Sequence, residues 1–281
     1  PINKLLKKLK KISSEEIELS ININNEDKYF LISGSRMEST NEYIVVISDI
    51  SSLRKLEDLR KNLISDISHE IKTPVAVIRA GSETLHSGNI KDRKVASKFT
   101  KSILDNSERL SEMIEDLLEL EKIEFGGLVI KKEKFIPHKE INKILGTIDA
   151  LVVEKQLVVE NNIPDDLKIK TDKESFRSIF SNLLDNAIKY SPKESKIIFS
   201  AIVQKNKIVI SIKDEGYGIE KNSINRVFER FYRSSKARAH TKGTGLGLAL
   251  VKQLSTRIGA DVSVESKINV GTEFFVSFQD K

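Results

Sequence analysis

The sequence predicts a multidomain α+β protein, and three patterns carry that prediction. Short segments of alternating polarity come first, two long stretches with apolar residues at steps of three and four follow, and a final region mixes both periods. These patterns divide the chain into domains at 1–51, 52–125 and 126–281. With 281 residues and 39% hydrophobic composition, the chain can bury more than one core.

The first domain combines a basic start with a small sheet. Three strands are expected at Ile17–Ile23, Lys28–Ser35 and Tyr43–Ser48, and Asp49-Ile50-Ser51 leads directly into a helix. Lysines within residues 1–13 supply five of the six net positive charges. Because the rest of the chain is nearly neutral, we expect no nucleic-acid partner. The lysine cluster indicates either a juxtamembrane segment that follows an upstream membrane span or a solvated helix face.

The first long helix carries an informative histidine. Its apolar stripe consists of Leu56, Leu59, Leu63, Ile67, Ile71, Val75 and Ile78. His69 projects roughly 160° from the centre of this stripe, so its ring should face solvent. Thr73 lies one turn further on the same face, and Glu70 is adjacent to the histidine. Pro74 removes a backbone donor and should bend the helix just after this turn.

An exposed histidine of this kind can act as a nucleophile. An ordinary solvated imidazole is about three-quarters neutral at pH 7, so a ring nitrogen is available without special activation. Glu70 can hold the tautomer and accept the other ring proton. Most exposed helical histidines are idle, so His69 gains meaning only from motifs elsewhere in the chain.

The second long helix is expected to begin after Asp92 as its N-cap. Its seam alternates by four and three through Phe99, Ile103, Asn106, Leu110, Met113, Leu117 and Leu120. One antiparallel hairpin cannot bury both stripes, so we expect a homodimeric four-helix bundle. Asn106 either fixes the register of this bundle or is a tolerated polar residue, and both interpretations stay open. Phe125-Gly126-Gly127 then breaks the helix and predicts a hinge.

The third domain mixes strands and helices in an order that suits an α/β sandwich. Strands are expected at Val129–Phe135, Leu157–Ile163, Ile197–Val203, Lys207–Lys213, Asp261–Ser266 and Thr272–Phe278. Helices are expected at Pro137–Glu154, Asp172–Tyr190 and Leu246–Ile258. Gln204-Lys205-Asn206 should join two neighbouring antiparallel strands.

The helix that ends at Tyr190 offers ligands for a phosphate and its metal. Asn182, Asn186 and Lys189 fall at i, i+4 and i+7, on one face. An amide oxygen is a suitable hard ligand for Mg²⁺, and an ammonium group offers a compact charge to phosphate. Solvated or capping side chains are the alternative for such an asparagine pair. Apolar neighbours favour a pocket floor.

Two glycine-containing blocks follow. Asp214 ends a strand before Gly216-Tyr217-Gly218, where missing Cβ atoms let the backbone approach a ligand. Its carboxylate can accept from the amino group of adenine, although an ordinary turn has the same sequence pattern. Gly243-Thr244-Gly245-Leu246-Gly247 precedes a helix, so its amides and the helix N-terminus predict an anion site.

Four blocks in this order resemble the sensor histidine kinases of two-component signalling. They are His69 to Pro74, Asn182 to Tyr190, Asp214 to Gly218 and Gly243 to Gly247. The resemblance implies a Bergerat-type ATP-binding fold for the third domain. Separately, the three short strands of the first domain, which lead directly into a helix, resemble the C-terminal part of a PAS sensor domain. The resemblance to the kinases also implies that His69 is the phosphoacceptor, that Glu70 is the acid/base, and that Thr73 helps to hydrolyse a partner's phospho-aspartate.

The same resemblance assigns the nucleotide site. The position of Asn186 binds Mg²⁺, that of Lys189 contacts the phosphates of ATP, and that of Tyr190 lines the nucleotide pocket. Val227 to Arg233 matches the phenylalanine block of the family, and Arg233 matches an arginine that reaches the terminal phosphate. Residues 234–242 match a lid over the nucleotide, which we expect to be mobile until ATP binds.

The function expected is therefore an ATP-dependent protein-histidine kinase. It phosphorylates His69 and passes the phosphoryl group to an aspartate in the receiver domain of a response regulator. A nucleotide-driven ATPase of the same fold is an alternative, but such ATPases carry a water-activating glutamate where this chain has Asn182. A catalytically silent dimeric scaffold is a second alternative, which the full set of site residues disfavours.

Composition fits the cytoplasm. The chain has no cysteine, no apolar run long enough for a membrane span and no visible signal peptide. It begins with Pro1 instead of methionine, which suggests a piece of a longer protein. We therefore expect a cytoplasmic kinase or the cytoplasmic part of a membrane-anchored one.

Overall fold

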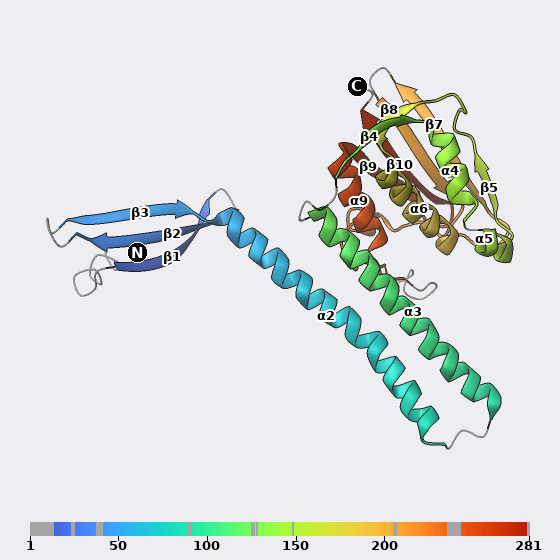
Figure 1. Ribbon diagram of the computed structural model, residues 1–281, viewed down its shortest axis with the longest axis horizontal. Coiled ribbons are helices and arrows are strands. Elements are labelled where there is room, and N and C mark those ends of the chain that lie inside the picture. Colours follow the sequence, from blue (N-terminus) through green and yellow to red (C-terminus); the bar gives the residue numbers. More distant parts are fainter. Residues whose placement is uncertain are drawn as a thin grey trace. The chain divides into compact units, whose positions relative to one another are not determined.

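The computed structural model describes residues 14–23, 26–37, 42–88, 92–124, 127, 129–147, 149–204, 207–234 and 243–279. The chain divides into two compact units, Pro1–Lys72 and Thr73–Lys281. Figure 1 shows a small sheet at the N-terminal end, two long helices, and a sandwich of helices and strands at the C-terminal end. The predicted hinge at Phe125-Gly126, the turn at 205–206 and most of the predicted lid lie outside the described residues.

The first unit begins with an antiparallel sheet of β1 (Ser14–Ile23), β2 (Glu26–Arg36) and β3 (Tyr43–Asp49). The three strands predicted from alternation are confirmed. Ile32 pairs with Ile17 on one side and Ile47 on the other, and Ile32 is only 4% exposed. A sheet with so small a core does not test the predicted likeness to a PAS domain, which stays a prediction.

Two long helices follow, as the apolar stripes predicted. Helix α2 (Ser51–His86) contains Pro74 without ending there, so the predicted bend stays a prediction. Helix α3 (Arg93–Glu124) begins after Asp92, whose Oδ1 accepts from the backbone N–H of Lys94 at 2.7 Å. This bond confirms Asp92 as the N-cap.

The C-terminal part of α2 packs closely against α3. A Cβ atom on Gly81 would lie 3.1 Å from Cγ1 of Ile103, so the glycine permits this approach. The Nδ2 group of Asn106 donates to the carbonyl of Ser102 at 2.7 Å, within its own helix. That bond uses one N–H of the amide and leaves its oxygen for another partner, so both interpretations of Asn106 remain open.

The sandwich is built on a five-stranded sheet in the order β5-β7-β8-β10-β9. Its strands are β5 (Val158–Asn161), β7 (Lys196–Gln204), β8 (Lys207–Asp214), β9 (Ala260–Lys267) and β10 (Gly271–Gln279). β5 runs parallel to β7, and the other neighbours are antiparallel. Helices α4 (Pro137–Leu145), α6 (Lys173–Tyr190) and α9 (Gly247–Ile258) lie together on this sheet (Figure 1). The predicted α/β sandwich is confirmed.

Aromatic packing fixes α6 on the sheet. Phe176 and Phe180 are fully buried with ring centroids 4.5 Å apart, and Phe199 of β7 lies 6.3 Å from Phe180. Asp172 caps the helix by accepting from the backbone N–H of Ser175 at 2.8 Å. The opposite face of α6 is thereby presented as the floor of a cleft.

Three details of the predicted elements were wrong. The helix expected at Pro137–Glu154 is split into α4 and α5 (Asp149–Lys155), because Gly146 and Thr147 end α4 with bonds back to its last turn. The first strand of the domain is shorter, β4 (Lys132–Phe135), and pairs with β6 (Ile169–Asp172). Sequence periodicity missed β6 and the short helix α7 (Lys221–Ile224), since four residues carry too little pattern.

Candidate active site

A continuous cleft between α6, α9 and the sheet has one apolar and one polar end. The apolar end is a cavity of about 100 Å³ beside Asp214, lined by Ile219, Leu248 and Phe274 among others. The polar end is a cavity of about 240 Å³ lined by the asparagines and lysine of α6 and by the 243–247 loop. Asn186, Tyr190 and Arg233 line both cavities. A ligand with a flat apolar part and an anionic part fits such a cleft.

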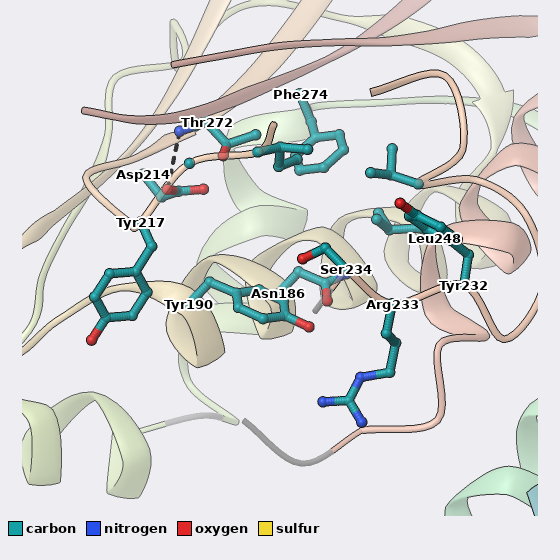
Figure 2. A pocket seen from close by; sticks show the side chains of 13 residues that line it. Asn186, Tyr190, Asp214, Tyr217, Tyr232, Arg233, Ser234, Leu248, Thr272 and Phe274 are labelled. Carbon is teal, nitrogen blue, oxygen red and sulfur yellow. Dashed lines mark hydrogen bonds between the residues drawn. The ribbon is translucent and has the colours of Figure 1, made fainter. Parts of the chain in front are cut away.

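Asp214 stands at the inner wall of the apolar end. Figure 2 shows it beside Thr272 and Phe274, across the cleft from Asn186 and Tyr190 of α6. Its side-chain Oδ1 accepts from the backbone N–H of Gly216 at 2.8 Å and of Thr272 at 3.1 Å. Burial raises the pKa of Asp214 to about 6, although the two N–H donors oppose the shift.

The arrangement leaves a defined acceptor for a ligand. Both hydrogen bonds of Asp214 to the described residues fall on Oδ1, so Oδ2 is left to face a donor from the cleft. A buried carboxylate oxygen is stabilised by an amino group such as that of adenine. Asp214 ends β8 as the sequence predicted, and its contact with adenine stays a prediction.

The glycines next to Asp214 let the chain pack closely against itself. A Cβ atom on Gly216 would lie 2.8 Å from the carbonyl oxygen of Tyr190, and one on Gly218 only 2.2 Å from that of Lys267. Gly218 also has φ +70°, which favours glycine. The chain's own backbone would meet a Cβ atom at either position, and Gly218 also lines the apolar end, so the expected approach of a ligand to this turn stays a prediction. They hold the turn after β8 against the end of α6 and against β9.

The two asparagines of α6 have fixed amide orientations. Asn182 donates through Nδ2 to the carbonyl of Ser178, and Asn186 donates through Nδ2 to the carbonyl of Asn182, both at 2.9 Å. Each Oδ1 is therefore turned away from the helix backbone. Asn186 Oδ1 is a hard oxygen donor at the junction of the two cavities, which fits a divalent cation. Lys189 lies one turn further along α6 and is exposed at the polar end.

The loop from Gly243 to Gly247 closes the polar end and leads into α9. Gly245 has φ +76°, and a Cβ atom there would lie 2.9 Å from the backbone of Phe231. A Cβ atom on Gly247 would lie 2.7 Å from Asn182 Oδ1, so this glycine lets the loop approach α6. Leu246 is fully buried and anchors the loop. The N-terminus of α9 thus faces the cavity, as an anion site requires.

Arg233 reaches this loop from the chain segment before the predicted lid. Its Nη1 donates to the carbonyl of Gly243 at 3.1 Å, and Arg233 lines both ends of the cleft. Figure 2 shows its side chain among those that line the apolar end. Of the predicted lid, only Ser234 is described, and it lines the apolar end. The guanidinium is placed where it can meet an anionic ligand.

Helix α3 contributes two acidic residues that the sequence did not predict. Glu112 and Asp116 line the polar end, and Asp116 Oδ2 accepts from the hydroxyl of Thr244 at 2.8 Å. Burial raises the pKa of Asp116, and the nearby charges of Glu112 and Glu119 act in the same direction. No local pattern could have indicated these residues, because helix periodicity does not show which loop of another domain a helix meets.

The predicted phosphoacceptor lies on α2. His69 is exposed, as its position on the helix predicted, while Glu70 is partly buried and Thr73 is exposed. His69 and Glu70 belong to the first unit, whereas Thr73 and all the cleft residues belong to the second. The structure thus gathers the predicted nucleotide residues at one site. It also confirms that the histidine ring is accessible.

Two family models match the chain and define the class of protein. Residues 59–126 match the His Kinase A (phospho-acceptor) domain, and residues 171–281 match the histidine kinase-, DNA gyrase B-, and HSP90-like ATPase. An ATPase domain of this class implies that the cleft binds ATP. A phosphoacceptor hairpin joined to such a domain is the arrangement of a histidine kinase.

Similar proteins identify the family. The sensor histidine kinase WalK of Bacillus subtilis (strain 168) is 33% identical over 235 residues, which are 82% of this chain and 38% of that protein. The sensor protein kinase WalK of Staphylococcus aureus is 30% identical over 239 residues, or 84% of this chain and 57% of that protein. The chain belongs to the two-component sensor histidine kinases. It spans less than two thirds of the length of these relatives.

Solved structures agree with this fold. The Acinetobacter baumannii histidine kinase AdeS matches with a TM-score of 0.63 and 25% identity, over 76% of this chain and 98% of that chain. The histidine kinase ThkA, in complex with the response regulator protein TrrA, matches with a TM-score of 0.64 and 18% identity, over 100% of this chain and 83% of that chain. At that identity the second likeness shows the fold alone. Among the described residues, no helix has both the length and the apolar character needed to cross a bilayer.

Proposed function

We propose that this protein is an ATP-dependent protein-histidine kinase that phosphorylates His69 and then donates the phosphoryl group to an aspartate of a response regulator. One observation carries the proposal. The cleft joins a buried carboxylate, suited to the amino group of adenine, to a loop and helix N-terminus suited to phosphate. The same chain exposes His69 on a phosphoacceptor hairpin of the family.

The proposed step is a direct phosphoryl transfer. A ring nitrogen of His69 attacks the γ-phosphorus, a P–N bond forms, the bond to the β-phosphate oxygen breaks, and ADP leaves. Glu70 accepts the proton from the other ring nitrogen. Lys189, Arg233 and the amides of the 243–247 loop neutralise charge on the phosphates, which is the main task of a protein in this reaction.

Magnesium fits the polar end of the cleft. Asn186 presents Oδ1 because its Nδ2 is already bonded to the helix backbone, and hard oxygen donors are the ligands that Mg²⁺ prefers. When bound, the ion would neutralise charge on the β- and γ-phosphates. Because ATP is the substrate, the proposal also places the cleft and His69 in the cytoplasm.

Labelling with γ-³²P-ATP and Mg²⁺ tests the proposal. Wild type should acquire acid-labile, base-stable label, and His69→Gln should acquire none. His86→Gln is the matched control, because His86 is also exposed on α2 and should leave labelling unchanged. Free phosphate without protein label would favour the ATPase alternative. The absence of both protein label and free phosphate would favour a silent scaffold.

Dimerisation and a receiver partner are part of the proposal. On α3, Leu104, Ile114 and Leu118 are 56%, 47% and 50% exposed, which is unusual for a helix that has no further partner. A second copy would bury these side chains in a four-helix bundle. Light scattering should therefore give the mass of a dimer. A purified receiver domain should remove label from His69, and a receiver whose aspartate is replaced should not.

Thr73 supports a second activity. It is exposed one turn from His69 on α2, where its hydroxyl can orient a water molecule toward a docked phospho-aspartate. Thr73→Ala should keep labelling of His69 and slow the dephosphorylation of the receiver. Equal dephosphorylation by wild type and variant would refute this role.

A further inference from the structure

Three residues form one row across the sheet behind the apolar end of the cleft. In the strand registers, Asp214 of β8 pairs with Thr272 of β10, and Thr272 pairs with Ser266 of β9. Directly paired residues on neighbouring strands lie on the same face of a sheet. Asp214 and Thr272 line the cavity, whereas Ser266 lies behind Thr272 and does not. Ser266 can therefore influence a ligand only through the residues that it contacts.

The hydroxyl of Ser266 makes three short contacts. Its Oγ lies 2.9 Å from the carbonyl oxygen of Gly271, 2.9 Å from Oγ1 of Thr272 and 2.8 Å from the backbone nitrogen of Ile219. A carbonyl can only accept and a backbone N–H can only donate. The single proton of Ser266 must therefore go to Gly271, and its oxygen accepts from Ile219.

This assignment fixes the hydroxyl of its neighbour. Since Ser266 has no second proton, the contact between the two hydroxyls is satisfied only if Thr272 donates and Ser266 accepts. Ser266 then uses one donor and two acceptor sites, which is its full capacity. Thr272 has spent its only proton on Ser266. Its Oγ1 can act toward the cleft only as an acceptor.

We infer, on the basis of the proposed function, that Ser266 is a positioning residue that sets base specificity by holding the Thr272 hydroxyl as an acceptor. With Oδ2 of Asp214, this wall of the cleft then offers acceptors alone. An exocyclic amino group, as in adenine, has two N–H donors for such a wall, directly or through a water. A base with a carbonyl at that edge, as in hypoxanthine or guanine, faces acceptors and leaves them unpaired.

A comparison of ATP and ITP tests this inference, because adenine presents an amino group where hypoxanthine, the base of ITP, presents a carbonyl. In wild type, ATP should bind more tightly than ITP in calorimetric titrations of the full chain. In Ser266→Ala the Thr272 hydroxyl can rotate and donate to a carbonyl. We expect ITP to gain and ATP to lose affinity, so that their ratio falls by about tenfold, the value of one neutral hydrogen bond.

Two controls separate specificity from folding. Ser266→Thr keeps a hydroxyl at the same place and should restore the wild-type ratio. Ser263→Ala removes an exposed hydroxyl from the same strand and should leave both affinities unchanged. If Ser266→Ala weakens ATP and ITP by the same factor, the serine is merely structural and the inference fails.

A second variant decides the matter should Ser266→Ala not fold. Thr272→Val removes the acceptor while keeping the shape of the side chain, and the ratio of affinities should again fall about tenfold through loss of ATP binding alone. An unchanged ratio would overturn the inference. Wild type that binds neither nucleotide would overturn the proposed function as well. If wild type binds ATP and is labelled at His69, but the ATP/ITP affinity ratio is the same in the variants as in wild type, only the role of Ser266 is overturned.

Discussion

Replacing Asp214 by asparagine should change how the stability of the catalytic unit depends on pH. The carboxyl group is 5% exposed, and burial raises its pKa from 3.8 to about 6. An asparagine keeps an Oδ1 for the N–H groups of Gly216 and Thr272 but does not titrate. The difference in unfolding free energy between wild type and variant therefore isolates the titration of this one group.

The sign follows from proton linkage. Between pH about 4 and about 6, the unfolded chain has lost this proton while the folded chain still holds it. Raising the pH through this window therefore destabilises wild type. Below and above this window, Asp214 makes no contribution to the pH dependence of the unfolding free energy. A shift of about 2 pH units corresponds to about 3 kcal/mol, since each unit is worth about 1.4 kcal/mol.

Denaturant titrations followed by circular dichroism at pH 4, 5, 6 and 7 would measure the effect. Titration of all other groups, including the salt-bridged Glu140 whose pKa is lowered, cancels in the difference between the two proteins. From pH 4 to pH 7, wild type should lose about 3 kcal/mol relative to Asp214→Asn. A difference that is flat over this range, or that moves in favour of wild type, would refute the assignment of a buried carboxyl with a raised pKa.

Three further outcomes can be checked. Glu140→Gln should lower the unfolding free energy by about 1–3 kcal/mol in denaturant titrations. The side chain of Glu140 is only 5% exposed, and it forms an ion pair at 2.6 Å with Arg177 of α6, whose side chain is one-third exposed. Gly218→Ala should lower the unfolding free energy by well over the ~1 kcal/mol expected of Gly88→Ala. Both glycines have positive φ, but only at position 218 would a Cβ atom lie against a carbonyl oxygen. Equal losses of unfolding free energy in the two variants would contradict this clash. Asp116→Asn should tighten ADP binding by about three- to tenfold, because it removes a negative charge beside the phosphate end of the cleft. Glu119→Gln is the control and should leave ADP binding unchanged, because Glu119 lies on the same helix but is hydrogen-bonded to Ser178. Equal effects of the two substitutions would indicate that they act through the docking of α3 instead.

The sequence predicted those parts of the fold that have a long period. The stripes of α2 and α3 extend over many turns, and α6 carries both its own apolar face and the asparagines, so a local pattern was sufficient. The break between α4 and α5 depends on one turn at Gly146, and β6 has only four residues. Such short elements form because the surrounding sandwich pairs and covers them, which a single sequence does not display.

The same distinction applies to the site. The predicted nucleotide residues belong to short sequence blocks, and the spacing within a block already places them on one helix face or in one loop. The row of Asp214, Thr272 and Ser266, in contrast, exists only because three strands align in one register. Asp116 reaches the 243–247 loop only because α3 packs beside α9. A motif can therefore indicate where a ligand binds without indicating which hydrogen-bonding groups recognise it. Gly216 and Gly218 illustrate this limit, because the motif located the turn correctly while the reason for glycine is the carbonyl oxygens of Tyr190 and Lys267. Selectivity for the base should accordingly respond to substitutions outside the four motifs, at positions that only the sheet register brings together.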